Sequence, residues 1–192
     1  MDHKKLFKAL LACTASGDTL GMLQFIYKAV ETDETETLVA VDGRIIACVC
    51  VAKDVIEQAI SSGIIVRHIT EHGTFYRDST CTNIPDSCYP SFEKTIPHLY
   101  PIGTENMGSK QFDYKYLKKA SDLFYEYCEY NPKYCKKFMF SHTAKHPTSV
   151  SVRIEKGILI GIVPIIPLNS SSYDEVDGIT EYGEVIKSSI NQ

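Results

Sequence analysis

The Asp42-Gly43 pair, which separates two runs of β-forming residues, is the feature that most constrains how this chain folds. Residues 38–41, Leu-Val-Ala-Val, precede the pair, and residues 44–51, which are rich in Ile, Val, Ala and Cys, follow it. An Asp-Gly pair in this context is one of the strongest short-range signals for a β-hairpin, because its tight turn needs positive φ angles. The sequence therefore predicts a β-hairpin over residues 38–51.

Further elements follow from local patterns along the chain. A second hairpin is predicted from residues 149–154 and 158–165, which flank Glu155-Lys156-Gly157, with a short strand before it near residues 138–141. Residues 64–76 are strand-rich, and residues 53–62 form either a helix closed by Gly63 or a loop. Residues 77–106 hold half of the eight prolines and are predicted to be mostly loop. No internal repeat is visible, and the pattern favours a mainly β fold.

One helix is predicted with a clear start and a clear apolar face. Asp113 is a good N-cap residue, and helical spacing begins directly after it and continues to about residue 130. The apolar face consists of Leu117, Ala120, Leu123, Phe124, Tyr127 and Cys128. A shorter helix or an irregular arm is expected over residues 4–13.

Length, charge and cysteine usage narrow the class of protein. The 192 residues suit one domain, which we expect over residues 1–168, with a polar and peripheral tail over residues 169–192. A net charge of −4 argues against a broad surface for polymeric nucleic acid, and no apolar run is long enough to span a membrane. Seven cysteines without zinc spacing indicate reduced thiols in a cytoplasmic protein, with no metal site and no cofactor.

Tyr114 and Lys118 are the first candidates for chemistry. They stand four residues apart in the first turn of the predicted helix, so that both lie on one side of it. A phenol beside an ammonium group at a helix N-terminus suits proton transfer. The competing interpretation is a solvated lysine beside a half-buried tyrosine, which is a common surface pair.

Two other kinds of hydrolytic site are alternatives to this pair. His68-Ile-Thr70 and His146-Pro-Thr148 match the His-x-Thr pair of two-histidine phosphoesterases, although Pro147 disturbs the strand expected there. A Cys-His or Ser-His protease lacks support, because no glycine-shaped nucleophile elbow is present around Cys81 or Cys88.

Arginines on strands are candidates for phosphate binding. Arg44 opens a strand of the first hairpin, and Arg153 lies in a strand of alternating apolar and polar residues. Such an arginine either holds a phosphate with two hydrogen bonds or serves surface solubility.

Several of these residues together resemble the poxins, metal-independent nucleases of poxviruses, baculoviruses and some moths that degrade 2′,3′-cyclic GMP–AMP. The specific part of the match is Gly108-x-x-Gln111-x-Asp113-Tyr114-x-x-Leu117-Lys118. Weaker matches are Val41-Asp-Gly-Arg44, the segment Val150-Ser-Val-Arg153-Ile-Glu-Lys156-Gly157, and His3 near the position of the family's N-terminal histidine. The chain departs from the family pattern around His3, and Ser151 stands where the family has a second arginine.

The resemblance implies a fold, a reaction and an assembly. The fold would be a chymotrypsin-protease-like two-barrel with one prominent helix in its C-terminal half, and the protein would be a homodimer. A ribose 2′-hydroxyl would attack the adjacent 3′–5′ phosphodiester of 2′,3′-cyclic GMP–AMP without a metal, thereby suppressing STING-dependent innate immune signalling in the host cytosol. His3, Tyr114 and Lys118 would be catalytic, with the assignment of acid and base left open.

The same resemblance implies a set of ligand contacts and one non-enzymatic alternative. Arg44, Arg153, Gln111 and Ser151 would contact the cyclic dinucleotide. A protein that binds a cyclic dinucleotide without cleaving it is the alternative from a different class, because of the departures at Ser151 and around His3.

Overall fold

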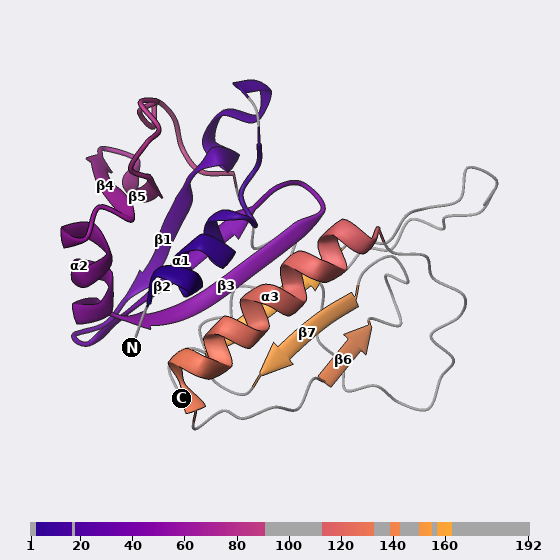
Figure 1. Cartoon of the computed structure of the whole chain (residues 1–192). Coiled ribbons are helices and arrows are strands. Elements are labelled where there is room, and N and C mark those ends of the chain that lie inside the picture. Colours follow the sequence, from indigo (N-terminus) through magenta and orange to yellow (C-terminus); the bar gives the residue numbers. More distant parts are fainter. Residues whose placement is uncertain are drawn as a thin grey trace.

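Eight strands pair into one antiparallel sheet in the computed structural model, which describes residues 3–16, 18–90, 113–132, 139–142, 150–154 and 157–162. The strand order is β4-β5-β1-β2-β3-β8-β7-β6 (Figure 1). The strands are β1 Ile26–Glu31, β2 Thr35–Val41, β3 Ile45–Ala52, β4 Ile65–Thr70, β5 Gly73–Asp78, β6 Met139–His142, β7 Val150–Ile154 and β8 Ile158–Ile162. The prediction of a mainly β fold with a helix in the C-terminal half is confirmed.

Two helices, α1 Lys4–Leu11 and α3 Tyr114–Tyr130, lie side by side on one face of this sheet (Figure 1). A 3₁₀ segment, η1 Asp18–Gln24, follows α1, and α2 Lys53–Ser61 connects β3 to β4. Both helices direct their apolar faces at the sheet, where Phe7, Leu10, Leu123 and Tyr127 are almost completely buried. The core therefore lies between the helix pair and the alternate residues of β2, β3 and β8 that face it.

The opposite face of the sheet has its own apolar cover. Val39, Ile46 and Cys48 point to this face and pack with Tyr27 and Tyr89. Tyr89 belongs to the segment that follows β5, so this segment crosses the sheet on the side away from α1 and α3. Because successive residues of a strand alternate between faces, β3 contributes to both apolar clusters.

The sheet contains a structural duplication that the sequence does not display. The helix α1 is followed by the meander β1-β2-β3, and α3 is followed by the meander β6-β7-β8. The last strands of the two meanders, β3 and β8, pair antiparallel at the centre, so the order β1-β2-β3-β8-β7-β6 is symmetric. The two units are thus related by an approximate two-fold arrangement. The sequence-based statement that there is no repeat holds for the residues but not for the topology.

The two-barrel architecture implied by the family resemblance is wrong for the described strands, which form one open sheet. Its outermost described strands are β4 and β6, and these do not pair with each other. A closed barrel requires such a pairing. Two local predictions are confirmed. The first hairpin forms with Gly43 at φ +88°, and the helix predicted to start after Asp113 spans Tyr114–Tyr130.

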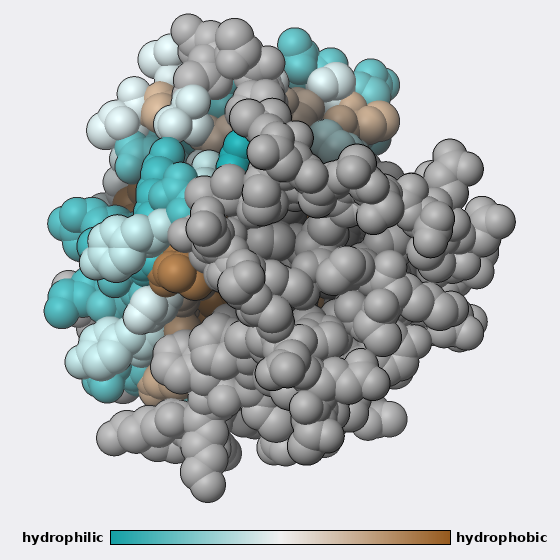
Figure 2. Space-filling view, turned by 90° about the vertical axis from the view of Figure 1, so that its right-hand side faces the viewer, coloured by the Kyte–Doolittle hydropathy of each residue, from teal (hydrophilic) through white to brown (hydrophobic). Residues whose placement is uncertain are grey.

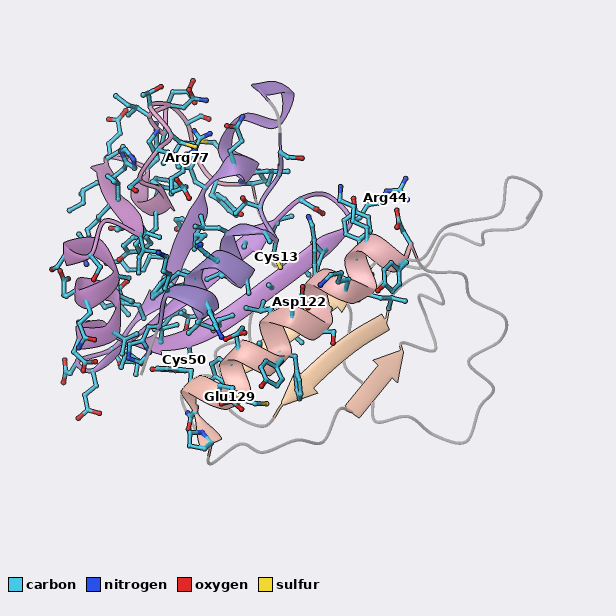
Figure 3. All side chains as sticks on the ribbon, viewed as in Figure 1. Cys13, Arg44, Cys50, Arg77, Asp122 and Glu129 are labelled. Carbon is cyan, nitrogen blue, oxygen red and sulfur yellow. The ribbon has the colours of Figure 1, made fainter. Side chains whose placement is uncertain are left out.

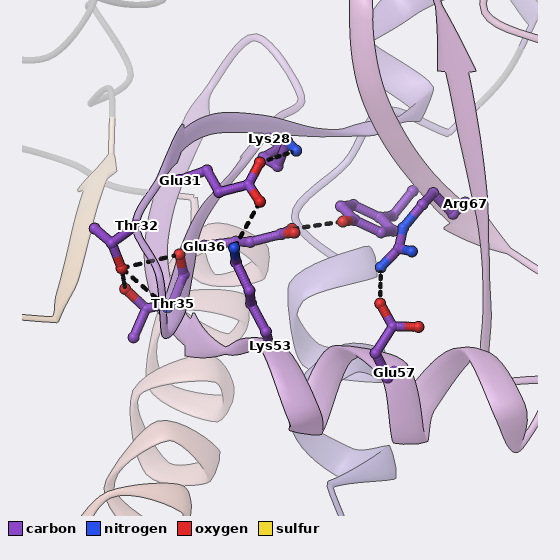
Figure 4. Close-up of polar contacts among 9 residues, drawn as sticks. Lys28, Glu31, Thr32, Thr35, Glu36, Lys53, Glu57 and Arg67 are labelled. Atoms are coloured by element: carbon purple, nitrogen blue, oxygen red, sulfur yellow. Dashed lines mark hydrogen bonds and ion pairs between the residues drawn. The ribbon is translucent and has the colours of Figure 1, made fainter.

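A buried polar contact crosses the sheet where β2 and β5 flank β1. The Tyr76 hydroxyl donates to the Glu36 carboxylate, and both residues are almost completely buried (Figure 4). Burial, together with this carboxylate, raises the pKa of Tyr76, so the phenol stays protonated. Nearby, Arg67 of β4 pairs with Glu57 of α2 and ties that helix to the edge of the sheet.

The structure describes only part of the domain that was predicted over residues 1–168. Residues 169–192, the predicted tail, lie outside the described residues. Among the helices that the structure describes, none combines the length and apolar character that crossing a membrane requires.

Candidate functional site

The N-terminal turn of α3 is built as the sequence predicted. Asp113 caps the helix, since its carboxylate accepts a hydrogen bond from the backbone N–H of Lys115 at 2.9 Å. Tyr114 is 75% exposed, and the side chain of Lys118 is 58% exposed. The first turn of α3 therefore presents a phenol and an ammonium group to solvent.

The electrostatics of Lys118 do not suit a general base. Its Nζ atom lies 2.6 Å from Oδ2 of Asp122, one turn further along α3. This hydrogen-bonded carboxylate raises the pKa of Lys118 and favours its charged form. A helix N-terminus by itself disfavours the charged form of a nearby lysine, so the Asp122 carboxylate acts on Lys118 in the opposite direction.

His3 does not meet Tyr114 and Lys118. Its ring lies edge-on to Tyr130, with the ring centroids 5.7 Å apart, at the C-terminal end of α3. Tyr114 is sixteen residues away on the same helix, which corresponds to about 24 Å at 1.5 Å per residue. The prediction that these three residues form one catalytic site is therefore contradicted: α1 runs antiparallel to α3 and carries the imidazole to the opposite end.

Arg44 does lie near the start of α3. Asp42 of the same hairpin accepts hydrogen bonds from the backbone N–H groups of Arg44 and Ile45, each at 3.1 Å. Its other oxygen, Oδ2, lies 2.6 Å from Nζ of Lys119 on α3. This ion pair pulls the hairpin tip against α3 and leaves Arg44 exposed near the N-terminal end of α3 (Figure 3).

The other predicted ligand residues are Ser151 and Arg153 on β7, and Gln111. Positions 151 and 153 on β7 pair in register with Gly161 and Leu159 of β8. Leu159 packs in the cluster on the sheet face away from the helices, so by register both positions belong to that face. Gln111 lies outside the described residues. The backbone register is all that the structure describes for Ser151 and Arg153, whose side chains lie outside the described part of the chain.

Of the two His-x-Thr motifs, the structure describes only the one at residues 68–70. His68 lies on β4 with its ring edge-on to Phe25, at a centroid distance of 5.9 Å. Burial lowers its pKa, with a further contribution from Arg77. His146 and Thr148 lie outside the described residues. No group of three or more His, Cys, Asp or Glu residues with the geometry of a metal site occurs in the described part of the chain.

The packing of α1 against α3 creates a surface that was not predicted from the sequence. We call the solvent-facing side of these two helices the basic helix layer. It carries the exposed lysines Lys4, Lys5 and Lys8 from α1 and Lys115 and Lys118 from α3. Lys119 of α3 is mostly buried and pairs with Asp42. The exposed large apolar or aromatic residues of α3 are Tyr114, Leu117 and Tyr125. Figure 2, whose left-hand edge is the side that faces the viewer in Figure 1, shows that edge mainly in hydrophilic colours.

Charge is segregated between this layer and the rest of the described chain. Helices α1 and α3 hold six lysines against the three carboxylates of Asp122, Glu126 and Glu129. Residues 12–90 hold five Lys or Arg against eleven Asp or Glu. No carboxylate lies in α1 or in the first two turns of α3, so these parts of the layer are strongly basic. A signal was present in the sequence, since the exposed residues of α1 are all lysines, namely Lys4, Lys5 and Lys8.

Comparisons with known proteins identify no family. No family model and no curated protein matches the chain. A solved structure of the DnaN sliding clamp, DNA polymerase III subunit beta, from Bartonella birtlesii bound to griselimycin is similar at 15% identity with a TM-score of 0.45. It is matched over 85% of this chain and 65% of its own length.

A second solved structure is the beta subunit from DNA polymerase of Streptococcus pyogenes. It is 12% identical with a TM-score of 0.21, over 90% of this chain and 30% of its own length. The chain thus spans less than two thirds of the length of either matched protein. Similarity at this level leaves the function to be argued from the residues of the chain itself.

Proposed function

We propose that the basic helix layer binds the phosphate backbone of nucleic acid without reading its sequence. The observation that carries this proposal is the segregation of charge: six lysines gather on two adjacent helices, while residues 12–90 are strongly acidic. The net charge of −4 is the sum over the whole chain and hides this difference between the two regions. The prediction that polymeric nucleic acid is not a partner was based on that sum. Local charge and not the chain average determines binding to a polyanion.

Several of these lysines are available for phosphates. No carboxylate of the described residues lies within 4 Å of the ammonium groups of Lys5, Lys8 or Lys115. Lys119 is different, because its side chain is only 16% exposed and is held by Asp42. Each lysine that contacts a phosphate releases condensed counterions, which is the main source of sequence-independent affinity.

The exposed tyrosines of α3 suit the same partner. Tyr114 is 75% exposed and Tyr125 is 61% exposed, and exposed tyrosines on a basic surface contact phosphates through the hydroxyl or stack on unpaired bases. Leu117 lies between them and is 38% exposed. A surface of lysines with interspersed aromatic rings is typical of nucleic-acid binding, whereas a purely solubilising helix face has no need of exposed rings.

The nuclease activity on 2′,3′-cyclic GMP–AMP stays a prediction of the family resemblance. Tyr114, Lys118 and Arg44 share one corner and suit a phosphate ligand there. His3 lies at the other end of α3, so the described residues offer no acid–base set at that corner. The geometry therefore favours binding of a phosphate backbone over cleavage of a cyclic dinucleotide.

Fluorescence anisotropy with labelled 20-base-pair duplexes of two unrelated sequences tests the proposal between 50 and 200 mM salt. We expect similar affinity for both sequences and a steep linear fall of log K with log salt. The double variant Lys5→Gln/Lys115→Gln removes two charges from the layer and is expected to make that slope shallower by about 2.

The matched control is Lys28→Gln/Lys53→Gln, which removes two charges elsewhere. These lysines pair with Glu31 at the surface, so their loss affects stability little. We expect the control to keep the salt slope of the wild-type protein. The proposal is wrong if the wild-type protein does not bind at 50 mM salt, or if both double variants weaken binding equally.

A further inference from the structure

A cysteine, a histidine and a glutamate meet at the turn between β4 and β5, away from the basic helix layer. The Sγ atom of Cys88 lies 3.3 Å from Nδ1 of His72. On the other side of the ring, Nε2 of His72 lies 3.5 Å from Oε1 of Glu71. Cys88 is the one exposed thiol among the cysteines that the structure describes. The order thiol, imidazole, carboxylate is that of an activated nucleophile with an oriented base.

A single aromatic ring holds the two halves of this cluster together. Tyr89, the residue after Cys88, stacks on Tyr27 with ring centroids 5.0 Å apart and planes 10° apart. Gly73, the residue after His72, lies against the same ring, since a Cβ at this position would be 3.0 Å from Cε2 of Tyr27. Tyr27 therefore fixes both the loop that carries Cys88 and the turn that carries His72.

The turn itself is also ordered. The backbone N–H of His72 donates to Oγ1 of Thr70 at 3.1 Å, and Gly73 takes φ +130°, a conformation that side chains other than glycine rarely adopt. The thiol and the imidazole thus meet because both flank residues that pack on one ring. A chance contact between two mobile surface side chains would lack these anchors.

We propose that Cys88 is a nucleophilic thiol that exchanges with low-molecular-weight disulfides, with His72 as its base. The Nδ1 atom of His72 takes the proton of the thiol, and the thiolate attacks one sulfur of the disulfide. A new S–S bond forms to Cys88, the old S–S bond breaks, and the leaving thiolate takes the proton from the imidazolium. The product is a mixed disulfide on Cys88 and one free thiol, with no further oxidant.

Disulfide exchange fits this site better than acyl transfer. Hydrolysis of an ester or a peptide needs donors for a tetrahedral oxyanion, and no glycine-shaped oxyanion hole adjoins Cys88 in the sequence. In disulfide exchange the developing charge lies on the leaving sulfur, and such a donor set is unnecessary. An exposed thiol beside a base is sufficient.

Two buried cysteines provide the contrast within the same chain. Burial raises the pKa of Cys13 and of Cys48 to about 12, which keeps both thiols protonated and unreactive. Cys81, seven residues before Cys88, is only partly exposed, as are Cys50 and Cys128. Among the cysteines that the structure describes, reaction in the folded protein should therefore select Cys88.

The test is the rate of mixed-disulfide formation with excess oxidised glutathione at pH 6.5, with the modified cysteine identified by peptide mass. The reference is a synthetic peptide of residues 84–90, which contains the same thiol without His72. We expect Cys88 of the folded protein to react on the order of tenfold faster than the peptide, because the adjacent Nδ1 atom of His72 takes the thiol proton as Cys88 attacks.

The His72→Gln variant is expected to reduce the rate at Cys88 to that of the peptide, whereas Cys81→Ser leaves it unchanged. Thermal unfolding of each variant shows whether the turn still folds. Equal rates for the wild-type protein and the peptide overturn the proposal, and this comparison does not depend on any variant folding. A folded His72→Gln variant that reacts like wild type overturns the role of His72.

Discussion

Lys119 of α3 and Asp42 at the tip of the first hairpin form a largely buried ion pair, with Nζ 2.6 Å from Oδ2 and side chains 16% and 6% exposed. The residues are 77 positions apart in sequence. Because Asp42 also accepts two backbone hydrogen bonds in its own turn, one carboxylate organises the hairpin and docks it on the helix. This contact places Arg44 beside the basic helix layer.

Removal of one partner should therefore be costly. Asp42→Ala leaves the Lys119 ammonium group in a mostly buried place and removes the acceptor of two backbone N–H groups. We expect a loss of about 3 kcal/mol in the free energy of unfolding, measured by urea denaturation. The control is Asp122→Ala, which breaks the exposed pair with Lys118 and should cost under about 1 kcal/mol. Equal losses for the two variants would show that the Asp42 pair is not buried in solution.

Gly157, at the turn between β7 and β8, is expected to be intolerant of any side chain. A Cβ at this position would lie 1.9 Å from Oη and 2.9 Å from Cζ of Tyr127, a residue that is 1% exposed. The backbone carbonyl of Gly157 also accepts from the N–H of Cys50 at 2.7 Å, so the turn cannot easily move away. Gly157→Ala should lower the free energy of unfolding by about 2 kcal/mol.

A double-mutant cycle with Tyr127→Leu distinguishes this clash from a general effect on the turn. Because leucine lacks the ring atoms that meet the new Cβ, Gly157→Ala should cost markedly less in the Tyr127→Leu background. Strictly additive losses would mean that the two residues are not in contact.

Alkaline pH should destabilise the protein through two buried thiols. Burial raises the pKa of Cys13 and Cys48 from 9.0 to about 12, whereas in the unfolded chain both ionise near their ordinary value. The stability that these groups contribute is thus complete below about pH 9. It is lost as the pH rises toward 12, at about 1.4 kcal/mol per pH unit for each thiol.

Urea unfolding under reducing conditions at pH 8, 9 and 10 measures this slope. Cys13→Ala/Cys48→Ala is expected to flatten the alkaline slope, although both substitutions lower stability at pH 8 by creating small cavities. The measurements stop at pH 10, near the ordinary pKa of tyrosine, because ionisation of the tyrosines affects stability increasingly above this pH. An unchanged slope in the double variant would assign the alkaline loss to other groups.

The family resemblance is tested by incubation with 2′,3′-cyclic GMP–AMP and with 3′,3′-cyclic GMP–AMP in EDTA. A linear product that keeps the 2′–5′ linkage would demonstrate the predicted nuclease, and Tyr114→Phe and Lys118→Ala should then each reduce its rate at least a hundredfold. The position of His3 beside Tyr130 leads us to expect that His3→Ala leaves that rate unchanged. A hundredfold loss in His3→Ala would mean that the chain rearranges when the ligand binds.

Local sequence signals were sufficient for most of the secondary structure. Asp113 as an N-cap and the apolar spacing after it located α3, and Asp42-Gly43 located the first hairpin, because caps and tight turns depend on residues close together in the chain. The placement of Tyr114 and Lys118 one turn apart on α3 also followed from helical spacing. Each of these features depends on interactions within a single turn or along a single helix face.

Pairing across the chain was decided by the tertiary structure alone. The union of β3 with β8 joins strands more than one hundred residues apart, and no residue pattern announces it, since any apolar strand offers the same backbone hydrogen bonds. The pairing of β3 with β8 joins the two meanders, so that the described strands form one open sheet. The family resemblance had implied two barrels. The same packing makes α1 antiparallel to α3. His3 therefore lies at the C-terminal end of α3, far from Tyr114 and Lys118, and the lysines of both helices lie on one surface.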